Sequence, residues 1–251
     1  MNLAPLLLLA AALLPVATPA AEPNSRSFAA EGFDRVELGG CDHVVVTPGA
    51  RFAVVARGTP ASLAAIRVKV DSGTLRLART PHSCERRAGA PAAEISVTLP
   101  RLHGVAMPGT GSMRVAAVAP DQFAASLSGT GNLTLATLRT ADGRIDLSGT
   151  GAVTVRGVEA ERLSLDLGGT GNIGAEGRAA TVALVAGGTG SIDAQALAAR
   201  TLTIDASGTG NVRARASDTA RIAASGLGRI AVTGGARCTV RRSGPARVTC
   251  G

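Results

Sequence analysis

The fold is decided by the stretch Ile145-Asp146-Leu147-Ser148-Gly149-Thr150-Gly151-Ala152-Val153-Thr154-Val155 and its repeats. Its central Gly-Thr-Gly recurs at spacings of 20, 20, 20, 19 and 20 residues, beginning at Gly109, Gly129, Gly149, Gly169, Gly188 and Gly208. A degenerate copy, Gly226-Leu227-Gly228, begins 18 residues after the last of these. A fixed period of this length indicates a solenoid, in which each repeat stacks on its neighbours.

Apolar side chains alternate with polar or small ones on both sides of each motif. The second residue after the motif is always apolar, as in Met113, Leu133, Val153, Ile173, Ile192, Val212 and Ile230. The second residue before it is also apolar, as in Leu127, Leu147, Leu167, Ala186, Ala206 and Ala224. Such alternation predicts strands with one face turned inward.

We therefore predict an all-β fold, a right-handed parallel β-helix of about seven coils. At least two strands meet at each Gly-Thr-Gly corner, and a third short strand occupies stretches such as Arg162–Leu163. We attribute the corner glycines to backbone conformations with φ > 0, which glycine adopts without strain. A leucine-rich repeat lacks support because its Leu-rich consensus with a fixed Asn is missing, and a helical solenoid needs about 34 residues per unit.

The segment before the first coil has a different pattern. It predicts short strands, one helical turn at Pro60–Ile66 and a hairpin over Val68–Leu77 that turns at Ser72-Gly73. The strands are Phe33–Leu38, Val44–Val46, Phe52–Ala56 and Ile95–Leu99. Because the end of a solenoid exposes apolar residues and unpaired backbone groups, we predict that residues 21–108 form an N-terminal β-rich cap. The coils then occupy residues 109–235, and residues 236–251 form a disulfide-closed cap at the other end.

The N-terminus predicts export. An apolar run of about 14 residues, Leu3 to Val16, is followed by small residues up to Ala21, which is typical of a signal peptide over residues 1–20. The run is shorter than the roughly 20 residues that span a bilayer, and no later run is long enough. We therefore expect a mature protein in the periplasm or outside the cell, with no membrane span.

Four cysteines in an oxidising compartment predict disulfides. Three pairings are possible, and we favour Cys41 with Cys84 and Cys238 with Cys250 because each pair lies inside one end of the chain. A zinc site is the alternative, although no CxxC or paired-histidine spacing accompanies the cysteines.

Several of these elements, in this order, are similar to those of a known family. They are the run from Phe33 to Gly40, the strand Val44-Val45-Val46, the hairpin Asp71-Ser72-Gly73-Thr74-Leu75, the strand Ile95–Pro100 and the Gly-Thr-Gly-Asn coils. Together they resemble the GIN-domain family, whose members are labelled head domains of autotransporter adhesins, over nearly the whole mature chain. The resemblance implies a β-helical envelope or surface protein whose biochemical role is generally unassigned.

Motifs that suggest chemistry have plainer explanations. The run Gly169–Gly174 matches a dinucleotide fingerprint, but no helix follows it, so neither a nucleotide nor another cofactor is expected. Asp146 and Asp166 occupy the same position in adjacent coils and could act on a polysaccharide as general acid and base. We favour two solvated carboxylates there. His43 and His82 lie near Cys41 and Cys84 in the sequence, but a metal or nucleophilic site would need free thiols. We therefore expect no catalytic, cofactor or metal site.

Positive charge is concentrated near the C-terminus. Residues 205–251 contain two Asp and eight Arg, which are Arg213, Arg215, Arg221, Arg229, Arg237, Arg241, Arg242 and Arg247. Rows of guanidinium groups suit phosphate or carboxylate ligands. An anionic polysaccharide or lipopolysaccharide is the partner we favour over nucleic acid, because the chain has no Trp or Tyr for base stacking. A merely solvated basic face remains an equal alternative.

These observations favour a non-catalytic exported envelope or surface solenoid, adhesin-like or binding anionic glycans. The alternative is a polysaccharide-active β-helix enzyme that uses stacked carboxylates. A third interpretation is self-association through a poorly capped end of the solenoid.

Overall fold

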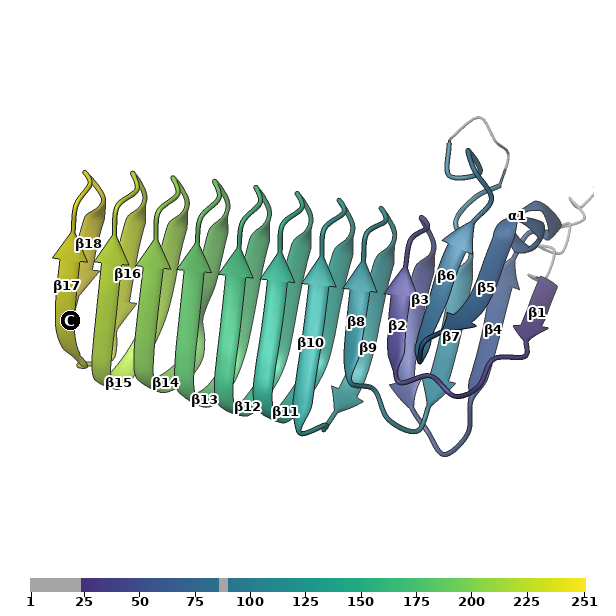
Figure 1. The fold of residues 1–251 in the computed structure, drawn as a ribbon, viewed down its shortest axis with the longest axis horizontal. Coiled ribbons are helices and arrows are strands. Elements are labelled where there is room, and N and C mark those ends of the chain that lie inside the picture. The colour runs from purple at the N-terminus through teal and green to yellow at the C-terminus, as the bar shows by residue number, and fades with distance from the viewer. Residues whose placement is uncertain (1–23, 86–89) are drawn as a thin grey trace, which may run out of the picture.

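The computed structural model describes residues 24–85 and 90–251, so the predicted signal peptide lies outside the described residues. Each Gly-Thr-Gly motif forms the corner of one coil of a parallel β-solenoid, and the corners form the upper edge in Figure 1. Five long strands make the central coils, each paired in parallel with the next: β11 (Asn132–Leu147), β12 (Ala152–Leu167), β13 (Asn172–Ala186), β14 (Ser191–Ala206) and β15 (Asn211–Ala224). The right-handed parallel solenoid predicted from the repeat is confirmed.

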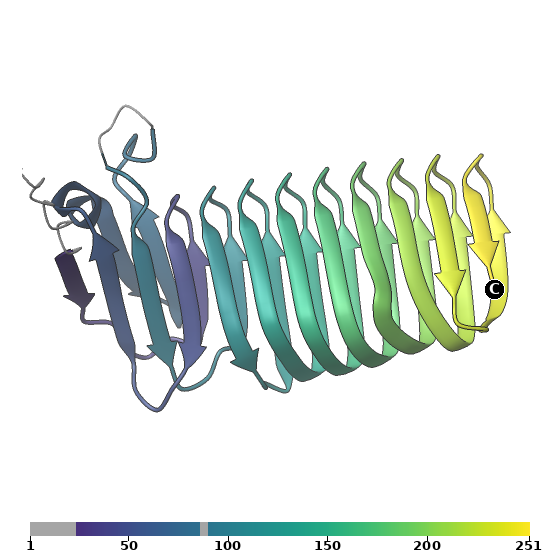
Figure 2. The same cartoon turned by 180° about the vertical axis from the view of Figure 1, so that it is seen from behind.

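Every long strand leaves one corner, bends over and returns to the next corner on the opposite side of the coil (Figures 1 and 2). We call sheet A the layer made of the strand portions that run into the corners. Sheet B is the layer of portions that leave them. The predicted third strand is wrong, because Arg162–Leu163 lies within the continuous strand β12. Each of these five central coils thus has one corner without strand structure and one bend within a strand.

Variation in the repeat length is absorbed at the bend. The coil of β13 is one residue shorter than the coils on either side of it. The parallel register therefore shifts between Val155 and Val158 where β12 pairs with β13, and shifts back between Gly174 and Gly177 where β13 pairs with β14. Gly157 and Gly177 lie there with positive φ, 58° and 128°, which glycine adopts without strain. The corners therefore stay in register while the bends differ.

The apolar positions of the repeat fill the interior. Leu133, Val153 and Ile173, which lie above one another in three coils, are each at most 1 % exposed. Stacked Leu, Ile, Val and Ala make one continuous core along the solenoid. The inward-facing positions predicted from the alternation are thus confirmed.

The corner glycines serve close packing, and the predicted positive φ is wrong for them. Among the described residues, the glycines with positive φ are Gly32, Gly73, Gly157, Gly177, Gly234 and Gly235, none of which belongs to a Gly-Thr-Gly motif. A Cβ on Gly171 would instead collide with the carbonyl oxygen of Gly151 in the preceding coil. Each corner backbone thus rests directly on the corner before it.

The parallel coils also include strands from before the first Gly-Thr-Gly motif. β8 (Gly104–Met107) and β9 (Ser112–Val118) form the coil around the first motif, and β10 (Gln122–Leu127) starts the next. β2 (Arg35–Leu38) and β3 (His43–Pro48) pair in parallel with β8 and β9. On their other side they pair in parallel with β6 (Thr74–Arg79) and β7 (Glu94–Leu99). The coil formed by residues 35–48 is therefore inserted between two coils that follow it in sequence.

Antiparallel strands lie beyond β6 and β7 at the N-terminal end (Figure 1). β4 (Ala53–Gly58) pairs with β7, and β1 (Asn24–Phe28) pairs with β4. β5 (Ile66–Asp71) forms the predicted hairpin with β6, turning at Ser72 and Gly73, which both have positive φ. Helix α1 (Pro60–Ala65) begins at Thr59, whose hydroxyl accepts a hydrogen bond from Ser62 N at 3.2 Å. The described residues contain no helix with the length and apolar character needed to cross a membrane.

The C-terminal end is a further rung. β16 (Arg229–Thr233) and β17 (Arg237–Arg242) pair in parallel with β15, and β18 (Arg247–Cys250) pairs with β16. Cys238 and Cys250 occupy inward-facing columns, opposite Ala220 and Val232, and are joined by a disulfide. Residues 236–251 thus continue the stack, with a disulfide across its exposed end.

Candidate binding surface

The eight arginines near the C-terminus, which we call the basic cluster, do not share one face of the solenoid. Register places Arg221, Arg237 and Arg241 on the outer side of sheet A, and we call these three the sheet A arginines. Register places Arg213, Arg229 and Arg247 on the outer side of sheet B, and these are the sheet B arginines. Arg215 lies at the bend, opposite Ala198.

Arg242 occupies an inward-facing column. It follows Ala206 and Ala224 in register on the last rung, and its Nη1 donates to Ala246 O at 3.4 Å. An inward-facing charge on an end strand discourages pairing with another strand. Arg242 thus has a structural explanation that needs no ligand.

The sheet A arginines lie on the last two rungs. Their strand β17 is exposed along its whole length, and Val240 within it is 44 % exposed. Among the described residues, the cluster has one ion pair, which joins Arg213 Nη1 to Asp193 Oδ2 at 3.7 Å on sheet B. The sheet A arginines therefore carry positive charge that no carboxylate within the described chain offsets by direct contact.

The two stacked carboxylates are bridged by an arginine. Asp146 and Asp166 lie opposite each other on adjacent strands of sheet A. Arg144 donates to both oxygens of Asp146 at 2.8 and 2.9 Å, and its Nη2 lies 3.8 Å from Asp166 Oδ2. These contacts raise the pKa of Arg144. One guanidinium thus contacts both carboxylates and stabilises their ionised forms, which disfavours a general acid at this place.

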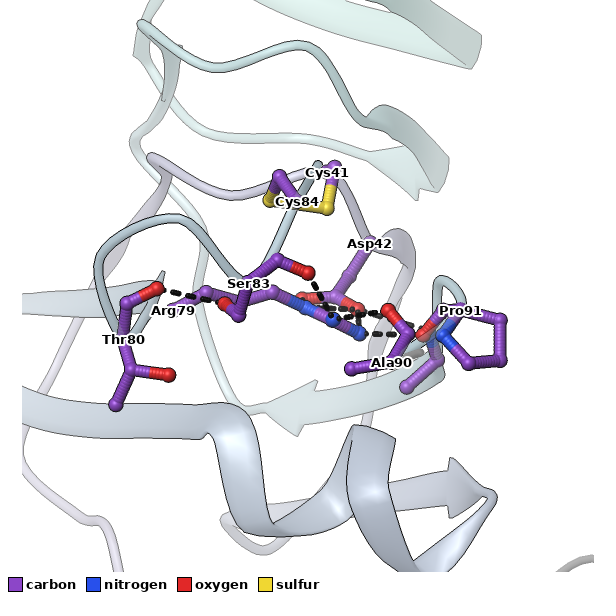
Figure 3. Close-up of a disulfide and its surroundings, with 9 residues drawn as sticks. Cys41, Asp42, Arg79, Thr80, Ser83, Cys84, Ala90 and Pro91 are labelled. Carbon is purple, nitrogen blue, oxygen red and sulfur yellow. Dashed lines mark hydrogen bonds and ion pairs between the residues drawn. A yellow bond between two sulfur atoms is a disulfide. The ribbon is translucent and has the colours of Figure 1, made fainter. Parts of the chain in front are cut away.

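The first disulfide lies beside a buried ion pair (Figure 3). Cys41 is bonded to Cys84, the pairing favoured from the sequence, with 5.8 Å between the Cα atoms. Asp42 accepts from Arg79 Nη2 at 2.6 Å, from Arg79 Nε at 3.0 Å and from Ala93 N at 2.8 Å. Both side chains are 2 % exposed, and Arg79 also donates to the carbonyls of Ala90 and Pro91. The buried charges are hydrogen-bonded to each other and to the backbone of Ala90, Pro91 and Ala93, so this group fixes the segment just before β7.

The histidines do not form a common site. His43 Nδ1 lies 2.7 Å from Ser112 Oγ, and His82 Nδ1 lies 2.7 Å from Glu85 Oε1. All four cysteines are in disulfides, so the thiol required for a nucleophilic or zinc site is not free.

A groove of about 650 Å³ on sheet A was not predicted from the sequence. It is lined at one end by Asp34, Arg35 and His103, and further along by Gln122, Asp142, Arg144, Arg162 and Thr181. These residues come from the inserted coil and from five coils after it, so no local motif unites them. The only signal in the sequence is that Asp142 and Arg162 occupy equal positions in adjacent repeats.

The fold matches solved structures of bacterial proteins. A crystal structure of a "putative adhesin" from Parabacteroides distasonis has a TM-score of 0.84 at 18 % identity, covering 92 % of this chain and 97 % of that one. A "putative lipid binding protein" from the same species has a TM-score of 0.78 at 17 % identity, with the same coverage. A "putative adhesin" from Bacteroides fragilis has a TM-score of 0.68 at 19 % identity, covering 92 % of this chain and 98 % of that one. These likenesses show the fold.

No curated protein matches the chain. A family model does, over residues 32–236, with the description "Putative auto-transporter adhesin, head GIN domain". It includes the inserted coil, the hairpin and the Gly-Thr-Gly coils, the elements on which the resemblance rested. The chain therefore belongs to the GIN-domain family.

Proposed function

We propose that this protein is an exported, non-catalytic binding module of the bacterial envelope or cell surface, which attaches to anionic glycans through the sheet A arginines. The observation that carries the proposal is the placement of Arg221, Arg237 and Arg241 on the last two rungs of one sheet, without a carboxylate partner among the described residues. Arg221 lies opposite Thr239, two residues from both Arg237 and Arg241 on the next rung, so its Cα atom is about 8 Å from each of theirs. Guanidinium groups on long side chains at that spacing can contact neighbouring phosphates or carboxylates of one polymer.

The family description and the predicted signal peptide support export and a surface role. The bridged Asp146 and Asp166 support a non-catalytic module, because a glycosidase needs one carboxyl that can release a proton and another that stays ionised. If the enzyme hypothesis were right, the purified protein would release reducing ends from an acidic polysaccharide, and Asp166→Asn would abolish the release.

The binding proposal is tested with polygalacturonate and with purified lipopolysaccharide as separate probes. The triple variant Arg221→Ala, Arg237→Ala, Arg241→Ala should bind at least about tenfold more weakly, equal to about 1.4 kcal/mol. The binding of the wild type should weaken as salt is raised, because exposed charges are screened.

A matched control removes the same charge from the opposite face. The triple variant of the sheet B arginines, Arg213→Ala, Arg229→Ala, Arg247→Ala, should keep most of the affinity. Equal losses in the two triple variants would show that only net charge matters, and salt-independent binding would contradict the electrostatic basis. Binding of neither probe would overturn the proposal.

A further inference from the structure

We propose that the groove on sheet A is a second binding site, which holds an uncharged, hydroxyl-rich oligosaccharide lying along the solenoid axis. This inference extends the proposed binding function to another surface and another ligand class. It rests on the balance of charge in the groove, on the groove's exposed hydrogen-bonding groups and on its length.

Charge in the groove is locally balanced, unlike that of the sheet A arginines. Arg162 donates from Nη2 to Asp142 Oδ2 at 2.6 Å and from Nε to the other oxygen. Arg144 is paired with Asp146, and Arg35 Nη1 lies 3.9 Å from Asp34 Oδ1. Every arginine that lines the groove thus has a carboxylate within 4.0 Å. A polyanion would gain little there, because each cation is already compensated.

Paired arginine and aspartate groups still have hydrogen-bonding capacity. A guanidinium carries five N–H donors, and a carboxylate accepts at about four positions. Arg162 uses two of its nitrogens on Asp142, and the side chains of Arg144 and Arg162 are each 60 % exposed. Sugar hydroxyls both donate and accept, so neighbouring hydroxyls can bind such a pair from outside. Gln122 and Thr181 add neutral donors and acceptors to the lining.

The N-terminal end of the groove offers an exposed carboxylate. The Asp34 side chain is 44 % exposed, and its Oδ2 lies 3.2 Å from His103 Nδ1, which is itself buried. A ligand in the groove cannot reach that nitrogen, so His103 does not select one. The Asp34 carboxylate can accept a hydrogen bond from a ligand hydroxyl.

The groove has the length and floor for several sugar units. Its lining extends from Arg35 at the inserted coil to Thr181 in β13, across six rungs in register. At about 4.8 Å per rung this is about 24 Å. Ala124 and Ala183, which lie on the outer side of sheet A, contribute a small apolar floor. An acyl chain would suit that floor but would leave the rim of charged groups desolvated, which is costly.

The test measures calorimetric binding of three neutral hexasaccharides, cellohexaose, maltohexaose and laminarihexaose, to the whole mature protein. We expect at least one to bind with an affinity that does not change with salt and that falls for the corresponding disaccharide. The double variant Gln122→Ala, Arg162→Ala should weaken binding at least about tenfold.

The control is Arg139→Ala, which breaks an exposed pair with Glu159 (3.0 Å) that also joins adjacent rungs but lies outside the groove. It should bind the oligosaccharide as the wild type does, and circular dichroism of both variants should match the wild type. Failure of all three oligosaccharides to bind, or equal effects of both variants, would overturn the inference. Binding of polygalacturonate alone, lost in the sheet A triple variant, would support the proposed function while overturning this second site.

Discussion

Replacing Gly171 by alanine tests whether the corners depend on close backbone packing. Gly171 is the second glycine of its motif, and Thr170 and Asn172 on either side donate backbone hydrogen bonds to Gly149 O and Gly151 O at 3.1 and 3.2 Å. An alanine Cβ would collide with Gly151 O and would lie 2.9 Å from Leu147 Cδ2. The backbone oxygen cannot move without shifting the preceding coil.

The expected cost follows from these contacts. Forcing an extra methyl group into a packed interior costs about 1 to 3 kcal/mol. Separating the corners enough to relieve the collision weakens at least one of the two backbone hydrogen bonds, worth about 1 kcal/mol. We therefore expect Gly171→Ala to lower the free energy of unfolding by about 2 to 4 kcal/mol.

The assay is urea denaturation followed by far-UV circular dichroism, since the chain has no Trp or Tyr for fluorescence. The control is Gly174→Ala in the same coil, where a Cβ would meet nothing within 4 Å and φ is not positive. That variant should be unchanged or more stable by up to about 1 kcal/mol, because alanine restricts the unfolded chain. If the two variants unfold at the same urea concentration, close packing is not the reason for the glycine.

Three further predictions concern the ends of the solenoid and its surface pairs. Cys238→Ser removes a disulfide that closes a loop with a sequence separation of 12, and it should lower the free energy of unfolding by about 2 to 3 kcal/mol. Amide hydrogen exchange should increase first in β17 and β18, and unchanged exchange in these strands would contradict this. Asp42→Ala leaves the Arg79 charge buried without a partner and should cost about 3 to 5 kcal/mol in urea denaturation, whereas a loss below 1 kcal/mol would show that water reaches the site. The hydrogen bond from Arg162 lowers the pKa of Asp142 from 3.8, so the stabilisation by this pair is complete above pH 3.8 and is lost as the pH falls through the lowered value. A carbon-13 NMR titration should show a higher pKa for Asp142 in Arg162→Ala than in the wild type, and an unchanged pKa would refute the assignment.

The period and the apolar alternation were enough to predict the coils. Positions such as Leu133 and Val153 follow one another at a fixed interval, and equal spacing along a solenoid means direct stacking. Strands β2 to β7 were also predicted within a few residues, because short β-branched runs bounded by turn residues such as Ser72-Gly73 are a local signal, whereas β1 and β8 were missed.

Features that depend on contacts between distant segments were not predictable. The sequence shows that glycine recurs at Gly151 and Gly171 but not which neighbour excludes a Cβ, since the neighbour is another coil's carbonyl. The prediction of a separate third strand in each coil was wrong, because the polar residues at a gradual bend within one strand have the same sequence pattern as a turn between two strands. The groove joins Arg35 to Arg144 through the insertion of one coil between two others, and a repeat search cannot detect a coil placed out of order.

The inserted coil has a consequence for how the protein reaches its native state. Coils from β10 onward can add one after another along the chain, each on a completed preceding coil. Residues 35–48 must instead wait, because the strands on both of their sides, β6 to β9, come later in the chain. The Cys41–Cys84 disulfide then stabilises the inserted coil in its place. If this disulfide formed before β8 and β9 had been synthesised, the N-terminal segment would be cross-linked before its neighbouring strands were present. We expect the N-terminal end, and not the long row of repeats, to set the pace of folding.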